Sequence, residues 1–509
     1  MKRLSFFLLF FLRLQFLLAE ADPAIFREYD IRGIVDEQIA VEDIPDIALA
    51  IVTYLRTVDN TVKTLAIGSD GRVHSPPIKA AMVNTLLKHG FDIIDIGTCT
   101  TPVMYYASHK LSVDAALMIT ASHNPGNYNG IKIRLGQRAV SGDEIRTIRD
   151  FYFSKSFISM SPQLGVCKDY DLITDYIDYL ATHFSHLVGK KIDAVIDCGN
   201  GAAGTVLPAL IKAMQWEDSV SLLFSEVDGT YPNHVADPTS EKNMADLKKV
   251  VLNSPGWIGI GLDGDCDRMA PMTSKGLLIK GDQLLALFSK PLLENNPDSR
   301  VVFDISSSLF LHQLIKNWGG TPLIAKTGIS NVSRMMSDNH AAIGGEISCH
   351  TIFSDRYFGF DDGIYSMMRL FEMLHESKLT LEEMVAILPN CVSSPTYRLP
   401  CERSACLELI DELYQELSCE EGTEIIAIDG IRIHYPDAWA IVRPSNTEPL
   451  ASIRFEGRTQ QDLEWIEERF APIINRYVEF IGSPKPVMLE SDCSPKQKRF
   501  VESLRNIRS

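Results

Sequence analysis

The sequence predicts an α/β fold made of several sandwich domains. Short apolar runs with strand character alternate with helical stretches such as 78–89 and 282–293, and this alternation favours βαβ units with mostly parallel pairing. A chain of 509 residues is long enough for three or four domains, and 45% hydrophobic with 23% charged residues is ordinary for folded α/β proteins. The expected strands are 64–67, 92–96, 115–119, 192–196, 257–262 and 301–305.

An internal repeat is indicated by two of these runs, which end in Asp197 and Asp304 about one domain apart. Proline-containing breaks near Pro162, Pro271 and 389–400 predict the domain boundaries. The expected parts are a hydrophobic extension at 1–23, domains at 24–163, 164–271, 272–392 and 393–482, and a tail at 483–509.

The amino terminus has the features of a secretory signal peptide. Lys2 and Arg3 precede an apolar run at 4–12, and small residues at 19–21 offer a cleavage pattern, although Arg13 interrupts the stretch and its length is short for a spanning helix. Ten cysteines occur singly with no CxxC pair, which favours a reducing compartment. We therefore expect a cytoplasmic protein, and export if residues 1–21 act as a signal peptide.

The net charge of −17 argues against a nucleic-acid partner, because the phosphates would be repelled. An anionic ligand would need a local basic cleft. The candidates for that cleft are Arg32, Lys132, Arg268 and Arg443.

A polar loop at 120–125 directly follows the apolar run at 113–119. In open α/β sheets, ligands and reacting groups lie at the carboxyl ends of strands, so Ser122 beside His123 is a candidate nucleophile. Alone, the Ser-His-Asn tripeptide is weak evidence, because such a sequence is usually an ordinary turn.

Three carboxylates at alternate positions, Asp263, Asp265 and Asp267, follow the strand expected at 257–262. Such a set suits a hard cation such as Mg²⁺ or Ca²⁺. An EF-hand is excluded because the sixth position is Arg268 instead of glycine and the twelfth is Ser274 instead of glutamate. A solvated acidic turn is the alternative.

Two further loops carry clustered polar groups. The loop at 344–350 combines a carboxylate, a hydroxyl and an imidazole behind two glycines, which suits sugar hydroxyls. The loop at 443–449 combines a guanidinium, two hydroxyls and an amide, which suits a phosphate dianion. The candidate ligands are Glu346, Ser348 and His350 in the former and Arg443, Ser445, Asn446 and Thr447 in the latter.

In this order, the four loops resemble the α-D-phosphohexomutase family. The resemblance runs from about residue 26 to about residue 477 and includes the segments 29–33 and 197–204. Asn446 and His350 look most like the bacterial phosphomannomutase/phosphoglucomutase branch, with phosphoglucosamine mutase as the alternative.

The resemblance implies three related α/β sandwich domains around a central cleft and a smaller C-terminal α+β domain. The four domains would carry, in order, the phosphoserine loop, the metal loop, the sugar loop and the phosphate loop. Ser122 would be the phosphoserine and would bind one Mg²⁺ together with the three aspartates. A hexose 1,6-bisphosphate would be the intermediate and activator, and a monomer or dimer without stable membrane association of the mature chain is expected.

The same resemblance assigns further roles. Lys132 would be a general acid or base with a lowered pKa. Arg32, His123 and Arg268 would surround the transferring phosphoryl group, while Tyr29 and the ligands of the last two loops would bind the phosphosugar.

Two positions depart from the family pattern. Ser306 stands where a lysine is common and Ile329 where a histidine is common, and each lost hydrogen bond to a charged oxygen would cost about 1.5–3 kcal/mol. Lys326 could compensate as a substrate-binding cation. The departures keep open a phosphosugar-binding protein with little turnover. A metal-dependent phosphatase that uses Ser122 is a second alternative, because water that reaches a phosphoserine gives net hydrolysis.

Overall fold

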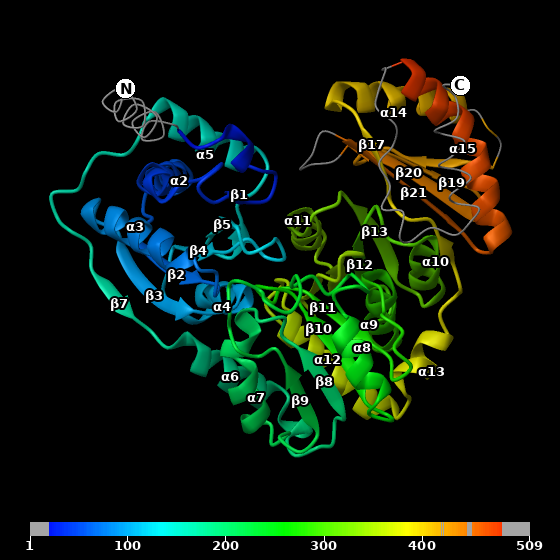
Figure 1. Cartoon of the computed structure of the whole chain (residues 1–509), viewed down its shortest axis with the longest axis horizontal. Coiled ribbons are helices and arrows are strands. Elements are labelled where there is room, and N and C mark those ends of the chain that lie inside the picture. Colours follow the sequence, from blue (N-terminus) through cyan, green and yellow to red (C-terminus); the bar gives the residue numbers. More distant parts are fainter. Residues whose placement is uncertain (1–19, 419, 421, 445–449, 481–509) are drawn as a thin grey trace, which may run out of the picture.

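The computed structural model describes residues 20–418, 420, 422–444 and 450–480. It contains four sheets that follow one another along the chain, and Figure 1 shows the four corresponding units along an arc, the first facing the fourth. We call them the first to fourth units. The predicted fold class, three α/β units and a smaller C-terminal α+β unit, is confirmed.

The first unit holds a seven-stranded sheet with the order β1-β5-β4-β2-β3-β7, and β6 pairs with β5. β4 lies parallel to β2, in a register that pairs Leu65 with Ala115 and Ser69 with Ile119. The elements are β1 (Ile31–Ile34), α2 (Ile44–Val58), β2 (Thr64–Ser69), α3 (Ser75–Lys88), β3 (Asp92–Thr98), α4 (Thr101–Lys110), β4 (Ala115–Ile119), β5 (Tyr128–Leu135), β6 (Arg138–Ala139), α5 (Asp143–Ser154) and β7 (Cys167–Asp169). The expected boundary after residue 163 falls before β7, the last strand of this sheet.

The second and third units have four-stranded sheets, ordered β11-β10-β8-β9 and β13-β12-β14-β15. The second contains α6 (Leu172–His183), β8 (Ala194–Asp197), α7 (Leu207–Ala213), β9 (Val220–Leu223), α8 (Ala245–Leu252), β10 (Ile258–Leu262) and β11 (Met269–Met272). The third contains α9 (Gly281–Asn295), β12 (Arg300–Asp304), α10 (Leu309–Asn317), β13 (Thr321–Ala325), α11 (Ile329–Asn339), β14 (Ile343–Gly345), β15 (Thr351–Phe353), α12 (Gly363–Ser377) and α13 (Leu381–Ala386).

The first three units repeat one topology, which confirms the internal repeat. In each unit, the first strand of the repeat is central, and the second and third strands lie parallel to it on its two sides. The fourth strand lies antiparallel to the third. The equivalent runs are β2-β3-β4-β5, β8-β9-β10-β11 and β12-β13-β14-β15. The third strands β4, β10 and β14 are buried along their whole length, as expected for strands covered on both faces.

The fourth unit is an antiparallel sheet ordered β16-β21-β20-β19-β18, with β17 also paired to β21. Figure 1 shows α14 and α15 on one side of this sheet. Its elements are β16 (Val392–Ser393), β17 (Tyr397–Pro400), α14 (Arg403–Leu417), β18 (Glu424–Ile426), β19 (Ile431–His434), β20 (Ala438–Pro444), β21 (Leu450–Gly457) and α15 (Gln460–Phe480).

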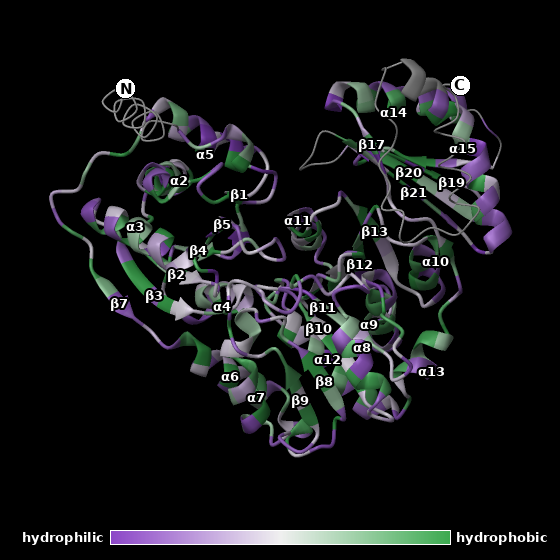
Figure 2. Ribbon diagram, viewed as in Figure 1, coloured by the Kyte–Doolittle hydropathy of each residue, from purple (hydrophilic) through white to green (hydrophobic). Residues whose placement is uncertain are grey.

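One apolar cluster runs through the first three units and contains Tyr105, Trp216 and Phe371, and each of these units also has a smaller or separate cluster of its own. The fourth unit has its own core, which includes Leu409 and Phe455. Figure 2 shows apolar residues concentrated along the strands and polar residues on the outer helices. Burial of these apolar surfaces is the main stabilising contribution.

A polar junction ties the fourth unit to the loop after β12. Arg432 on β19 is buried and donates to the carbonyl oxygens of Ile305 and, at 2.6 Å, of Ser307. Glu456 on β21 accepts from Trp439 Nε1 at 2.9 Å and from the Leu309 amide at 3.1 Å. The relative placement of the third and fourth units therefore depends on a few buried hydrogen bonds.

The expectations about the amino terminus fall on residues 1–19, outside the described residues. Within the part that the structure describes, no helix has both the length and the apolar character needed to cross a bilayer.

We predict that Arg432→Met destabilises the fold by about 2–6 kcal/mol, since two buried carbonyl groups lose their donor at about 1–3 kcal/mol each. Urea unfolding monitored by Trp fluorescence measures the change. Arg458→Met is the matched control, because Arg458 is 60% exposed and pairs only with the exposed Asp437 among the described residues. Equal shifts for the two variants would contradict the importance of the junction.

Candidate active site

Three loops from equivalent positions of the first three units meet at one cleft of about 560 Å³. They follow β4, β10 and β14, whose carboxyl ends point to the same region, and the fourth unit contributes Arg443. The predicted site residues that line this cleft are Tyr29, Arg32, Ser122, His123, Lys132, Asp267, Arg268, Glu346, Ser348, His350 and Arg443.

Ser122 lies at the junction of the first and second units and is 2% exposed. Its Oγ donates to Asp263 Oδ2 at 3.0 Å and lies 3.1 Å from His123 Nδ1. Its φ of +52° is in the left-handed region, which is uncommon for a residue with a Cβ and is often found at functional sites. The Ser122 amide donates to Thr120 Oγ1 at 2.9 Å, so the strained turn is held from within the loop.

Arg72, which follows β2, fixes the backbone of the same loop. Its guanidinium is fully buried and donates to the carbonyl oxygens of Ser122 at 2.8 Å and of Asn124 at 2.7 Å. The other arm reaches the carbonyl oxygens of Pro125 and Tyr128, and Nε pairs with Asp70 at 3.0 Å. One side chain thus positions the whole turn that carries Ser122.

The three aspartates after β10 are buried, and one oxygen from each lies within 4.8 Å of the others. Asp265 Oδ1 accepts no hydrogen bond from any described residue although it is buried, which is costly for a carboxylate oxygen. Burial and the charges of Asp267 and Asp265 raise the pKa of Asp263 well above its usual value. The group therefore has the ligand chemistry and the unsatisfied charge that a divalent cation would neutralise.

Lys132 on β5 contacts these carboxylates. Its Nζ lies 2.7 Å from Asp265 Oδ2 and also pairs with Asp267. Burial alone would lower the pKa of Lys132, but Asp265 and Asp267 outweigh it and hold the pKa well above its usual value. The expectation of a lowered pKa near several cations was wrong for this structure, because the nearest charges are carboxylates.

The loop after β14 forms a compact polar cluster. Ser348 Oγ lies 3.0 Å from His350 Nδ1, which is 3.1 Å from Glu346 Oε2. On its other side, His350 Nε2 lies 3.1 Å from Arg268 Nε and 3.3 Å from Asp267 Oδ1. Burial and Arg268 lower the pKa of His350, but Asp267 and Glu346 raise it overall to about 9.

Other predicted residues lie away from this cluster or outside the described residues. Arg443 pairs with Asp429 at 3.1 Å, and Ser445, Asn446 and Thr447 are among the residues that the structure does not describe. Lys326 does not line the cleft but a neighbouring pocket.

The two family departures occupy different surroundings. Ile329 lines the cleft itself, whereas Ser306 lines an adjoining pocket of about 250 Å³ with Arg443 and Arg454. Arg454 donates to the Ser306 carbonyl oxygen at 3.1 Å. A cation from the fourth unit therefore lies near the position where the resemblance expects a lysine.

Sequence reasoning missed several residues around the cleft. Arg27 and Arg398 line it, and Thr101 donates to Asp265 Oδ2 at 2.6 Å. The signal for Arg72 was present, because Asp70 and Arg72 follow a predicted strand just as the metal and serine loops do.

The fold and site define an enzyme of the phosphohexomutase class. The chain matches four models described as phosphoglucomutase/phosphomannomutase domains, the α/β/α domains I, II and III at residues 23–159, 174–276 and 280–391 and the C-terminal domain at 398–473. The chain belongs to the phosphoglucomutase/phosphomannomutase family.

Individual relatives support the same family assignment. A phosphomannomutase/phosphoglucomutase of Pseudomonas aeruginosa is 35% identical over 91% of this chain and 97% of its own length. A phosphoglucomutase of Neisseria gonorrhoeae is 36% identical over 88% and 96%, respectively. The crystal structure of a phosphoglucomutase/phosphomannomutase family protein from Burkholderia thailandensis superposes with a TM-score of 0.83 at 31% identity, covering 91% of this chain and all of that one.

We predict that Arg72→Lys lowers catalytic turnover more than tenfold, because an ammonium cannot donate to carbonyl groups on both sides of the turn, and roughly 1.4 kcal/mol of lost positioning already equals tenfold. A steady-state mutase assay measures the effect. Arg334→Lys is the control, since Arg334 is 59% exposed. Wild-type turnover in Arg72→Lys would show that Ser122 is positioned without this side chain.

Proposed function

We propose that this chain is a phosphohexomutase that interconverts the 1-phosphate and the 6-phosphate of mannose, glucose or both. The observation that carries the proposal is the Ser122 hydroxyl, 3.0 Å from Asp263 in a cleft lined by Arg32, Lys132 and Arg268. The names of the bacterial relatives support the same activity and both sugars. Phosphoglucosamine mutase is the alternative within the class.

The reaction uses one nucleophile twice. A hydroxyl oxygen of the monophosphosugar forms a bond to the phosphorus on phosphorylated Ser122, the bond from phosphorus to Oγ breaks, and the hydroxyl proton leaves to a base. The resulting hexose 1,6-bisphosphate turns over and returns its other phosphoryl group to Ser122. Arg32, Arg268 and Lys132 stabilise the charge on the phosphoryl oxygens, which is the main catalytic requirement of such transfers.

The carboxylate triplet fits one Mg²⁺ per site, with Asp263, Asp265, Asp267 and the oxygen on Ser122 as its ligands. Two observations support the fit. The buried Asp265 Oδ1 receives no hydrogen bond from any described residue, and all the proposed ligand atoms are oxygens, which hard cations prefer. When bound, the cation would supply Lewis acidity towards the phosphoryl oxygens.

Two side chains are candidates for moving the proton. Burial and the cations Arg268 and Arg32 lower the pKa of His123 well below its usual value, so its imidazole is neutral beside Ser122 Oγ. Lys132 is the acid or base that the family resemblance favours. Burial lowers the pKa of Lys132, whereas the two carboxylates that we propose as metal ligands raise it. A cation that neutralises these carboxylates would therefore lower the pKa of Lys132.

The remaining contacts bind the part of the sugar that is not reacting. Glu346, Ser348, His350 and Tyr29 would hold sugar hydroxyls, and Arg443, Ser445, Asn446 and Thr447 would hold the distant phosphate. Because the bisphosphate must bind in two opposite orientations, discrimination at carbon 2 is expected to be relaxed. We further propose hexose 1,6-bisphosphate as activator and a cytoplasmic location.

Ser122→Ala is expected to reduce conversion roughly a thousandfold, because the acceptor and donor oxygen is lost. Substrate affinity should remain within about threefold, as the binding contacts lie elsewhere. A bisphosphate-primed assay with glucose and mannose 1-phosphates, combined with intact-protein mass spectrometry, measures both the turnover and the phosphoryl group on Ser122.

The same assay separates the alternatives. A mutase yields the 6-phosphate with little free phosphate, a phosphatase releases inorganic phosphate, and a binding protein takes up ligand without conversion. Normal turnover in Ser122→Ala would exclude the proposed mechanism.

Asp265→Asn is expected to weaken Mg²⁺ or Mn²⁺ binding by roughly tenfold or more, since affinity depends on the charge of the ligands. Isothermal titration with the metal alone measures this without reference to turnover. Asp246→Asn, on the exposed surface of α8, removes the same charge elsewhere and should leave binding unchanged. Unaltered affinity in Asp265→Asn would place the metal elsewhere.

A further inference from the structure

A second pocket, of about 680 Å³, adjoins the active-site cleft between the first, third and fourth units. It shares Arg27, Glu28, Tyr29 and Thr327 with the cleft, but neither Ser122 nor any of the three aspartates lines it. We call it the side pocket. Its lining residues are Ala24, Phe26, Arg27, Glu28, Tyr29, Arg146, Arg149, Lys326, Thr327, Asn331, Arg403 and Asp429.

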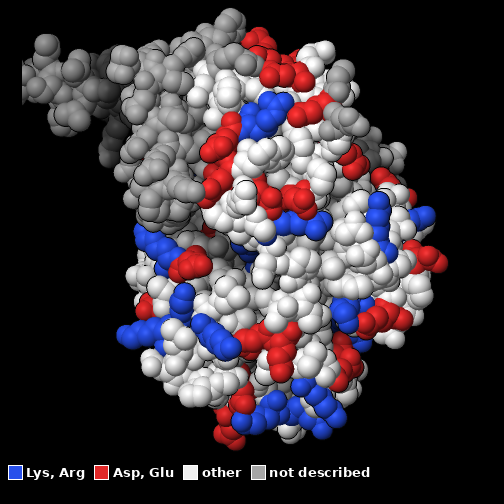
Figure 3. Space-filling view, turned by 90° about the vertical axis from the view of Figure 1, so that its right-hand side faces the viewer, with Lys and Arg blue, Asp and Glu red and all other residues white. Residues whose placement is uncertain are grey.

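The side pocket is strongly basic in an acidic protein. It contains five cationic side chains and two carboxylates, a formal charge of +3, whereas the whole chain carries −17. Both carboxylates are engaged, Glu28 with Arg146 at 3.0 Å and Asp429 with Arg443 at 3.1 Å. Within the described residues, Lys326 and Arg403 form no ion pair. The face of the molecule in Figure 3, by contrast, mixes acidic and basic side chains.

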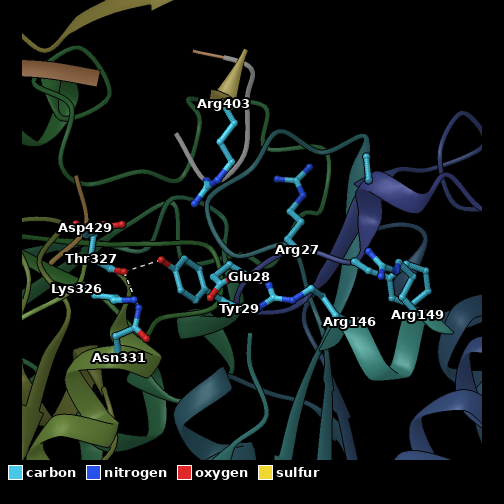
Figure 4. Close-up of a pocket in the computed structure, with 12 residues that line it drawn as sticks. Arg27, Glu28, Tyr29, Arg146, Arg149, Lys326, Thr327, Asn331, Arg403 and Asp429 are labelled. Atoms are coloured by element: carbon cyan, nitrogen blue, oxygen red, sulfur yellow. Dashed lines mark hydrogen bonds and ion pairs between the residues drawn. The ribbon is translucent and has the colours of Figure 1, made fainter. Parts of the chain in front are cut away.

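The cations come from four separate segments. Arg27 precedes β1, Arg146 and Arg149 lie on α5, Lys326 precedes α11, and Arg403 is the first residue of α14. Figure 4 shows Arg403 reaching from the fourth unit towards the part of the first unit that carries Arg27, with Lys326 and Asn331 on the side of the third unit. Arg146 also pairs with Asp143, and Arg149 pairs with Asp150 at 2.9 Å, so these two arginines are partly neutralised within α5. The like charges that remain, brought together from three units, would be stabilised by an anion between them.

The wall shared with the cleft is rigid and polar. Tyr29 donates to the Thr327 carbonyl oxygen at 2.6 Å, and Asn331 donates to the same oxygen at 2.9 Å. Next to them, a Cβ on Gly328 would lie 2.2 Å from the Tyr29 ring, so the first and third units are in close contact here. The cleft and the side pocket therefore lie on either side of one shared wall, and Arg27 is a cation that lines both.

We infer that the side pocket is a holding site for one phosphate group of the bisphosphorylated sugar while that sugar reverses its orientation. The inference rests on the proposed function. During the reversal, both phosphates leave their contacts in the cleft. A basic pocket at the edge of the cleft attracts the bisphosphate and so reduces its escape into solvent. Multi-oxygen phosphate dianions match the arginine-rich lining.

The test measures how often the intermediate escapes. Isotopically labelled glucose 1-phosphate is converted in the presence of excess unlabelled glucose 1,6-bisphosphate, and mass spectrometry gives the label in free bisphosphate per molecule of glucose 6-phosphate formed. In the double variant Arg149→Gln/Arg403→Gln this ratio should rise on the order of tenfold, since each exposed charge pair is worth up to about fivefold. Single-turnover transfer from phosphorylated Ser122 should stay within about twofold of wild type, because neither arginine lines the cleft.

The control is Lys88→Gln/Lys212→Gln, which removes the same charge from exposed positions on α3 and α7. It should show the wild-type ratio, and each single arginine variant should show an intermediate one. A wild-type ratio in the double arginine variant, or an equal rise in the control, would overturn the holding site while leaving the mutase intact. Failure of the wild-type protein to form glucose 6-phosphate would instead overturn the proposed function, and this inference with it.

Discussion

The hydrogen bond between Ser122 and Asp263 joins loops that follow strands of two different sheets, and much of the surrounding structure serves to maintain it. Thr101 of the first unit binds the Asp265 carbonyl oxygen through its amide at 2.9 Å and the Asp265 carboxylate through its hydroxyl. Gly264 permits the close approach, because a Cβ there would lie 2.5 Å from the Ser122 carbonyl oxygen. Ser122 and the acidic triplet can therefore stay together only if the two units remain in contact.

Equivalent aspartates at the end of the central strand support this arrangement in the first and third α/β units. Asp70 binds Arg72 and Thr120, and so acts on the loop of Ser122. Asp304 accepts from the amides of Ser306 and Ile347, and so acts on the loop after β14. One position in the repeated topology thus stabilises loops that differ completely in chemistry, which explains how a duplicated sheet can supply separate functions to one cleft.

Features that depend on a local pattern of residues could be predicted from the sequence. The strand at 115–119 and the loops after β4, β10 and β14 follow from hydrophobic runs and polar clusters adjacent in the chain. Contacts between distant segments could not be derived in this way. The guanidinium of Arg72 acts on carbonyl groups about fifty residues away, the charge state of Lys132 depends on carboxylates of another unit, and Lys326 faces the side pocket because of how three units pack.

The hydrogen bonds from Arg432 and Arg454 to the loop at 305–307 have a mechanical consequence. The fourth unit cannot rotate independently of the third, because a rotation would displace the backbone of Ser306 to which Arg454 is hydrogen-bonded. The position of the fourth unit and the backbone at 305–307 are therefore mechanically linked. Substrate selectivity in this protein should accordingly depend on residues at that pivot as well as on those that touch the sugar.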